Sequence, residues 1–144
     1  MKIECLLTVA CLLCGCAGNS GKNGTETGSD HDEHGCIASA GYVWSEVRQD
    51  CIRPFETGVK LVSVTPADSG AVYAAYMVFS ADSSRVELFL PGQEETDVLD
   101  RRVLPGGERV WNVEDDDTKN VRLIDGLWTI SQRNKLIYSQ KAGN

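Results

Sequence analysis

The stretch NVRLIDGLWTISQRNKLIY, residues 120–138, decides the fold class, because two turn signals divide it into three short segments. Asp125-Gly126 is typical of a type I′ hairpin turn, which requires a positive φ angle at both central positions. Arg133-Asn134 stands where a second turn of this kind would reverse the chain. The segments between the turns are rich in branched and aromatic residues, which strands favour. The stretch therefore predicts an antiparallel meander.

Five more segments of strand composition precede this stretch, and breakers separate them. Residues 85–90 (RVELFL) alternate between the two faces of a strand and end at Pro91-Gly92. No segment after residue 36 shows a sustained helical period. We expect an all-β fold, either a single small antiparallel barrel or a sandwich. The eight predicted strands cover residues 59–65, 72–79, 85–90, 96–101, 109–113, 120–124, 127–131 and 135–138.

Alternation within these strands predicts which side chains form the core, because successive residues of a strand point to opposite faces. In the meander, Trp128 should share a face with Ile130, and Leu136 with Tyr138. In the strand 85–90, one face should point inward and the other outward. The inward face holds Val86, Leu88 and Leu90, and the opposite face holds Arg85, Glu87 and Phe89.

The N-terminal segment Leu13-Cys14-Gly15-Cys16 follows a nine-residue apolar run and places a small residue directly before a cysteine. The run is far shorter than the roughly 20 residues of a membrane-spanning helix. This pattern resembles a bacterial lipoprotein signal, or lipobox. The resemblance implies that residues 1–15 are a signal peptide that is removed, and that Cys16 is acylated and anchors the chain. The alternative is an ordinary cleaved signal that ends near residues 17–18.

The resemblance also bears on location and on the remaining cysteines. Ala17, where sorting signals would otherwise have aspartate, favours the outer membrane without indicating which face. Of the six cysteines, three leave with the signal and Cys16 takes the lipid, so Cys36 and Cys51 remain. In an oxidising, exported compartment such a pair predicts a disulfide, which contributes roughly 3 kcal/mol for a loop of about 15 residues. The rival interpretations are a reactive thiol or a metal pair.

Three segments follow the signal. Residues 16–35 are rich in glycine and poor in apolar residues, which predicts a flexible tether. Its His31-Asp32-Glu33-His34 run would bind a metal weakly at best, because nothing orients the ligands. Residues 36–57 should form a disulfide-stapled aromatic cap, and residues 58–144 the β domain.

The string CIASAGYVWSEVRQDCIRPFE, residues 36–56, resembles a cysteine-flanked module near the N-terminus of other predicted bacterial lipoproteins. That resemblance implies no activity. Tyr42, Trp44 and Arg53 are either a recognition patch or part of a structural cap. We favour the cap, in which Tyr42, Trp44 and Phe55 pack near the disulfide, because stapled aromatics usually pack.

The composition argues against catalysis and against nucleic acid as a partner. The net charge of −7 disfavours binding to phosphate backbones. Both histidines lie in the predicted tether, so the folded domain has no histidine base for a nucleophilic triad. Neither a phosphate-cradling loop nor a dinucleotide motif occurs. The acidic run 114–117 lacks the spacing of a calcium loop and predicts a solvated turn. We expect no cofactor, no metal and no enzymatic activity.

The string Asn120-Val121-Arg122-Leu123-Ile124-Asp125-Gly126-Leu127-Trp128-Thr129, together with the anchor, resembles membrane-bound inhibitors of c-type lysozyme. The resemblance implies an eight-stranded barrel that inserts a loop into the lysozyme active site. The serine-glycine-rich inhibitory loop of that family is missing from this chain, and no Lys-Gly-Asp-Glu string follows Trp128, so the family's inhibitory residues are not carried over. The leading hypothesis is a monomeric, membrane-anchored binding or envelope-protection module with an unknown protein or small-molecule ligand. A lysozyme inhibitor and a structural envelope protein are the alternatives.

Overall fold

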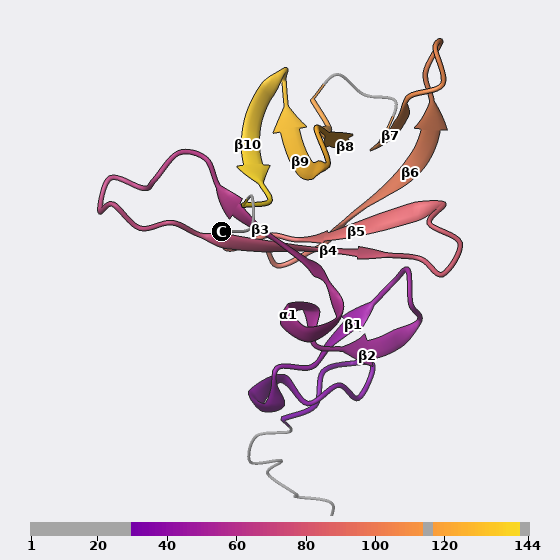
Figure 1. Ribbon diagram of the computed structural model, residues 1–144. Helices are drawn as coiled ribbons and strands as arrows, with labels where there is room; N and C mark the ends of the chain where they lie inside the picture. Colours follow the sequence, from indigo (N-terminus) through magenta and orange to yellow (C-terminus); the bar gives the residue numbers. More distant parts are fainter. Residues whose placement is uncertain (1–29, 114–116, 142–144) are drawn as a thin grey trace, which may run out of the picture.

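A computed structural model describes residues 30–113 and 117–141, and the predicted signal peptide, Cys16 and the residues 114–116 of the acidic run lie outside these ranges. The all-β prediction is confirmed: eight antiparallel strands form a closed barrel, and a two-stranded ribbon lies beside it (Figure 1). The ribbon region contains a 3-10 turn at Ala38–Ala40, β1 (Val43–Ser45), β2 (Asp50–Ile52) and α1 (Pro54–Thr57). The barrel contains β3 (Val59–Ser63), β4 (Ala74–Phe79), β5 (Arg85–Phe89), β6 (Asp97–Val103), β7 (Arg109–Asn112), β8 (Lys119–Ile124), β9 (Leu127–Gln132) and β10 (Lys135–Ser139).

The barrel is an up-and-down meander in which each strand pairs with its neighbours in sequence. Closure comes from β10, which pairs with β9 and also with β3, where Tyr138 lies opposite Ser63. Because the sheet closes on itself, the fold is a barrel and not a sandwich. The two predicted hairpin turns also have the expected geometry, because φ is positive at both residues of Asp125-Gly126 and of Arg133-Asn134.

The barrel interior is filled by side chains, as the small diameter of an eight-stranded barrel requires. Val86 and Leu88 lie inside, as their alternation predicts, and Leu90 and Trp128 pack against the same cluster. Trp128 and Ile130 share this inner face, which confirms the prediction for β9. The buried cluster consists of Leu61, Met77, Val86, Leu88, Leu99, Trp111, Val121 and Ile130.

The prediction that Leu136 and Tyr138 share a face is wrong, because β10 contains a register shift. Leu136 pairs with Ser131, and Tyr138 pairs with the adjacent Ile130, so Ile137 is an extra residue in the ladder. Tyr138 and Ile137 therefore both pack against the core, whereas Leu136 is 41% exposed.

The outer face of β5 is buried where the ribbon region covers it. Glu87 points away from the barrel core and is 0% exposed, because β1 and the turn after it lie over it. A second apolar cluster fills the same layer. It consists of Val47, Ile52 and Val78, with Phe89 and Val98 packed against them.

The cap is confirmed to contain a Cys36–Cys51 disulfide. Its boundary with the tether needs correction, because residues 30–35 are part of it. Asp32 accepts hydrogen bonds from the backbone N–H of Cys36 and of His34, and His31 forms a β-bridge with Ile37. In the described part of the chain, no helix has the length and hydrophobicity needed to cross a bilayer.

Candidate functional site

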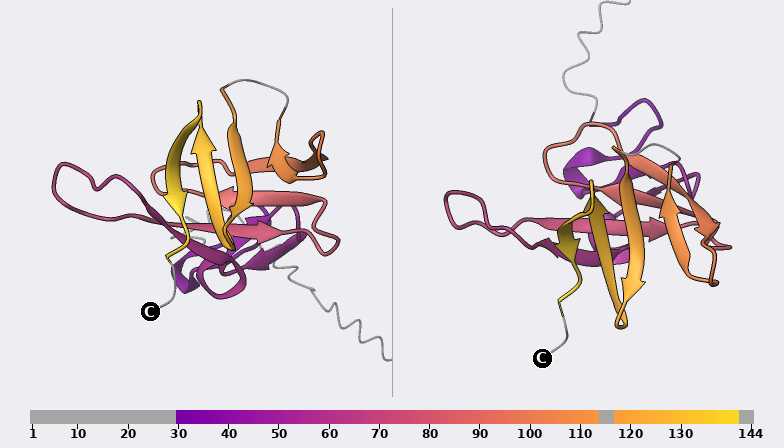
Figure 2. Two further views of the ribbon diagram at one scale, coloured as in Figure 1. Left: turned by 45° about the horizontal axis from the view of Figure 1, so that its top comes forward. Right: turned by 90° about the horizontal axis from the view of Figure 1, so that it is seen from above.

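The connection between β3 and β4 projects well beyond the barrel (Figures 1 and 2). It runs from residue 64 to residue 73, longer than the roughly two to five residues that join most hairpins. The sequence-based strands reached residue 65 on one side and began at residue 72 on the other, so both ends of this loop were wrongly assigned to strands.

Hydrogen bonds within the loop hold its shape. The Gly70 N–H donates to the Ala67 carbonyl at 2.7 Å, and the Ala67 N–H donates to the Ala71 carbonyl at 2.9 Å. Gly70 has a φ angle of 78°, which glycine adopts without strain. The tip residues Asp68 and Ser69 are exposed. A loop fixed in this way loses little conformational entropy when it binds.

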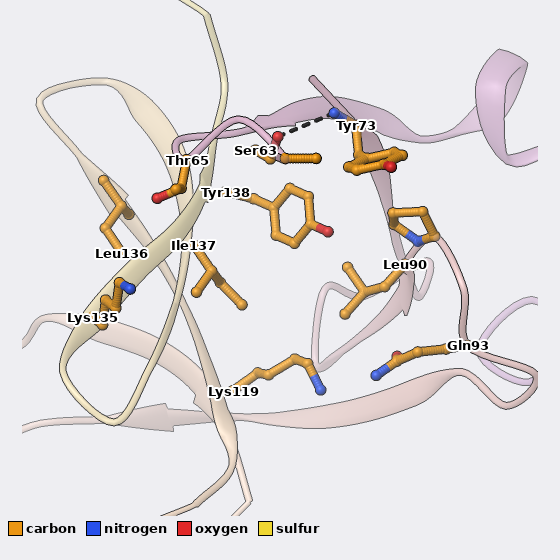
Figure 3. A pocket seen from close by; sticks show the side chains of 12 residues that line it. Ser63, Thr65, Tyr73, Leu90, Gln93, Lys119, Lys135, Leu136, Ile137 and Tyr138 are labelled. Carbon is orange, nitrogen blue, oxygen red and sulfur yellow. Dashed lines mark hydrogen bonds between the residues drawn. The ribbon is translucent and has the colours of Figure 1, made fainter. Parts of the chain in front are cut away.

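Two hydrogen bonds join the two ends of the loop where it leaves the barrel. The Ser63 N–H donates to the Tyr73 carbonyl at 2.8 Å, and the Tyr73 N–H donates to the Ser63 hydroxyl at 3.0 Å (Figure 3). Large apolar side chains remain exposed along both arms, with Val64 at 43%, Val72 at 52% and Tyr73 at 48%. Grouped exposed apolar residues on a projecting element are typical of a protein-binding surface.

A hollow of about 390 Å³ lies at the base of the loop, at the end of the barrel where β5 finishes and β10 begins. Figure 3 shows the Tyr138 ring reaching toward Leu90 and Tyr73, while the side-chain ends of Lys119 and Gln93 face each other. The lining residues are Ser63, Thr65, Ala67, Tyr73, Leu90, Pro91, Gln93, Lys119, Lys135, Leu136, Ile137 and Tyr138. We call this hollow and residues 64–73 the loop-end site.

The polar side chains of the hollow are hydroxyl and amide groups, which both donate and accept, and ammonium groups, which only donate. Two lysines and no carboxylate line it, although Asp97 lies behind Lys119 and pairs with its ammonium at 2.8 Å. Burial raises the pKa of the Tyr138 hydroxyl above its ordinary value of 10.0. Tyr138 therefore stays a neutral hydroxyl at physiological pH.

The predicted surface residues Tyr42, Trp44 and Arg53 contact parts of the cap. The Arg53 guanidinium lies 4.6 Å from the centre of the Tyr42 ring and donates to the Ala40 carbonyl at 2.9 Å. The Trp44 ring stacks on His34 at 4.4 Å between centroids, and its N–H donates to Glu46 at 3.1 Å. All three side chains therefore make contacts within the cap. Phe55, expected to pack near the disulfide, is 54% exposed.

Neither histidine of the chain lines the loop-end site. The His31 ring donates to the Gly35 carbonyl at 2.9 Å and His34 stacks on Trp44, so both histidines engage groups of the cap. Among the residues that the structure describes, no cluster of three or more potential ligands is arranged to hold a metal.

Sequence reasoning missed the loop-end site. Residues 64–73 were divided between two predicted strands and a short connection, so the length of the β3–β4 loop was not anticipated. The signal was present in Pro66 and Ser69-Gly70 between two strands that pair with each other. The branched and aromatic residues on either side obscured it, because strands and exposed binding loops both contain them.

No family model, curated protein or solved structure in the comparisons matches this chain.

Proposed function

We propose that this chain is a membrane-anchored, non-enzymatic binding protein that engages a protein target through the loop-end site. The observation that carries the proposal is the projecting β3–β4 loop, held by its own hydrogen bonds beside a hollow. A convex, ordered element next to a concavity suits a partner that has both a cleft and a raised rim.

The composition of the loop supports a protein target over a small ligand. Exposed Val64, Val72 and Tyr73 supply apolar and aromatic area, which is concentrated at the centres of protein interfaces. Asp68 and Ser69 at the tip supply polar groups at the deepest point of an insertion. The hollow by itself is shallow and open, whereas good small-molecule sites enclose most of the ligand.

The anchor belongs to the same proposal. Acylation of Cys16 would tether the domain to the outer membrane, with the segment before Asp30 as the connection. A binding protein held at the surface it protects acts at high effective concentration without being lost to the medium.

A second and narrower candidate function is inhibition of c-type lysozyme. Two observations favour it: the barrel has eight strands, and a loop with Ser69-Gly70 projects from it. Both are features that the resemblance of the C-terminal strands implies for that inhibitor family. The Lys-Gly-Asp-Glu string is absent, so the lysozyme proposal rests on the barrel and the loop.

The experiment is a cell-wall lysis assay with c-type lysozyme and the detergent-solubilised full chain. We expect stoichiometric inhibition by the wild-type chain and at least a tenfold higher half-inhibitory concentration for Ser69→Arg. Thr57→Arg, an exposed change at the end of α1 in the cap, is the matched control and should inhibit like wild type. No inhibition at molar excess would rule out the lysozyme function.

A separate arm tests the binding proposal itself. A photo-crosslinking residue at Ser69 should give adducts with envelope or host-fluid proteins on intact cells, whereas the same residue at Thr57 should not. Equal labelling from both positions would contradict a site at the loop.

A further inference from the structure

A second hollow, of about 520 Å³, lies at the opposite end of the barrel, where β4 ends and β9 begins. Its position is independent of the loop-end site, because β8 contributes Lys119 from its first residue to one hollow and Leu123 from near its end to the other. The lining residues are Phe79, Ser83, Arg101, Gly107, Glu108, Arg109, Trp111, Leu123 and Trp128. We call it the aromatic-end hollow.

Three aromatic rings form its floor. Phe79 lies 4.9 Å from Trp128 and 5.3 Å from Trp111, and the two indoles meet edge to face at 5.4 Å. Together they close the barrel core at this end. Such a cluster is rigid, because each ring is held by the other two, and it presents flat apolar area to whatever enters.

The two indole N–H groups differ. Trp111 is 5% exposed and donates its N–H to the Ser83 carbonyl at 3.0 Å, which fixes the ring. Trp128 is only partly buried, and within the described residues its indole N–H has no hydrogen-bond partner. Trp128, a lining residue, therefore has an indole N–H that none of the described residues engages.

The rim is cationic, in a chain whose net charge is −7. Arg101 and Arg109 line the hollow, and neither guanidinium takes part in an ion pair among the residues that the structure describes. Glu108 is the carboxylate in the lining, and it is engaged by Arg122 at 3.6 Å. Leu123, 52% exposed, adds an apolar edge.

We propose that the aromatic-end hollow binds a small aromatic or hydrophobic anion, with a carboxylate as the charged group. The apolar body would lie on Trp128 and Phe79, and the carboxylate would accept hydrogen bonds from Arg101 or Arg109. Guanidinium groups bind carboxylates through paired donors, and a site of several hundred cubic ångströms suits a ligand of this size. This function is separate from target binding by the loop.

The test uses three naphthalene probes of similar shape: 2-naphthoate, 2-naphthalenemethanol and 2-naphthalenemethylamine. Calorimetry on the full chain should give at least tenfold tighter binding of the anion than of the cation, with the alcohol between them. In ¹⁵N-labelled protein, 2-naphthoate should shift the Trp128 indole N–H signal and leave that of Trp44, in the cap, unchanged. Equal affinity for the three probes would overturn the role of the arginines, and a shift confined to Trp44 would overturn the location.

Three variants distinguish binding at this hollow from a general effect of charge. Arg101→Gln combined with Arg109→Gln should weaken 2-naphthoate binding at least tenfold, whereas Arg48→Gln combined with Lys60→Gln, two exposed positions that line neither hollow, should change it less than twofold. Leu123→Asp, at the exposed rim, should weaken binding of the anionic probe and should not weaken binding of the cationic probe. If either the double arginine variant or Leu123→Asp binds 2-naphthoate as tightly as wild type, the proposal is contradicted.

Discussion

Replacement of Glu87 by alanine should detach the cap from the barrel. Glu87 lies on the outer face of β5 and is 0% exposed. One carboxylate oxygen accepts the Ser45 hydroxyl at 2.6 Å and, more weakly, the Val47 N–H at 3.4 Å. The other accepts the Thr96 hydroxyl at 2.7 Å. The side chain therefore links β1, the turn after it and the segment before β6.

The expected loss in the free energy of unfolding follows from the buried donors that lose their acceptor when Glu87 is replaced. Ser45 is 0% exposed and Val47 is 7% exposed, so water reaches neither donor easily. Loss of the acceptor costs about 1–3 kcal/mol at the Ser45 hydroxyl and about 1 kcal/mol at the more weakly bound Val47 N–H, and the space left by the side chain adds about 1 kcal/mol. Thr96 is half-buried and can turn to water at little cost. We expect Glu87→Ala to lower the free energy of unfolding by about 3–5 kcal/mol.

Urea denaturation followed by circular dichroism measures this loss. Glu87→Gln keeps the shape and one acceptor, so it should lose only about 1–2 kcal/mol. Glu95→Ala is the control, because Glu95 is an exposed carboxylate on the same side of the barrel, and such surface changes cost under about 0.5 kcal/mol. If Glu87→Ala and Glu95→Ala are equally stable, Glu87 does not hold the cap.

Three further predictions concern the anchor, the disulfide and one turn. Cys16→Ser should move the protein from the membrane fraction to the soluble fraction in detergent partitioning, and unchanged membrane association would refute acylation at that residue. Cys51→Ala should lower stability by roughly 3 kcal/mol while the barrel spectrum persists, and two free thiols in native protein would contradict the bridge. Hydrogen bonds from the Ser84 hydroxyl and N–H, and from the Ser80 hydroxyl, hold the pKa of Asp82 far below its ordinary value of 3.8. Because the folded pKa is the lower one, this stabilisation is present above pH 3.8 and is lost as pH falls further, so the stability gap between wild type and Asp82→Asn should narrow on acidification below pH 4.

The local features of the fold follow from the sequence because they depend on short-range chemistry. The turns Asp125-Gly126 and Arg133-Asn134 have positive φ at both central residues. Glycine, asparagine and aspartate tolerate this conformation best, so their presence in the sequence indicates such turns. Alternation within β5 and β9 likewise shows which side chains point inward. Closure of the barrel cannot be predicted from the sequence in this way. It depends on pairing between β10 and β3, which are far apart in the chain.

The wrong predictions arise where the local sequence pattern does not determine the structure. Alternation assumes an unbroken ladder, so the bulge at Ile137 reversed the expected direction of Leu136. A charged residue opposite a core face is normally solvated, and only the cap from elsewhere in the chain makes Glu87 buried. At the loop-end site, Val64 and Val72 have strand composition although they belong to a projecting loop.

The most direct test of the binding proposal compares two glycine substitutions in calorimetric titrations with c-type lysozyme. Gly70, at the loop tip, and Gly126, in the β8–β9 turn, have φ angles of 78° and 79°, and a methyl group added to either would meet no atom within 4 Å. Alanine at either position therefore introduces a similar backbone strain of about 1 kcal/mol, but only Gly70→Ala alters the loop. We predict one-to-one binding by wild type and by Gly126→Ala, and at least fivefold weaker binding by Gly70→Ala. Equal affinity of all three proteins would contradict recognition through the loop, and no binding by any of them would exclude lysozyme as the target.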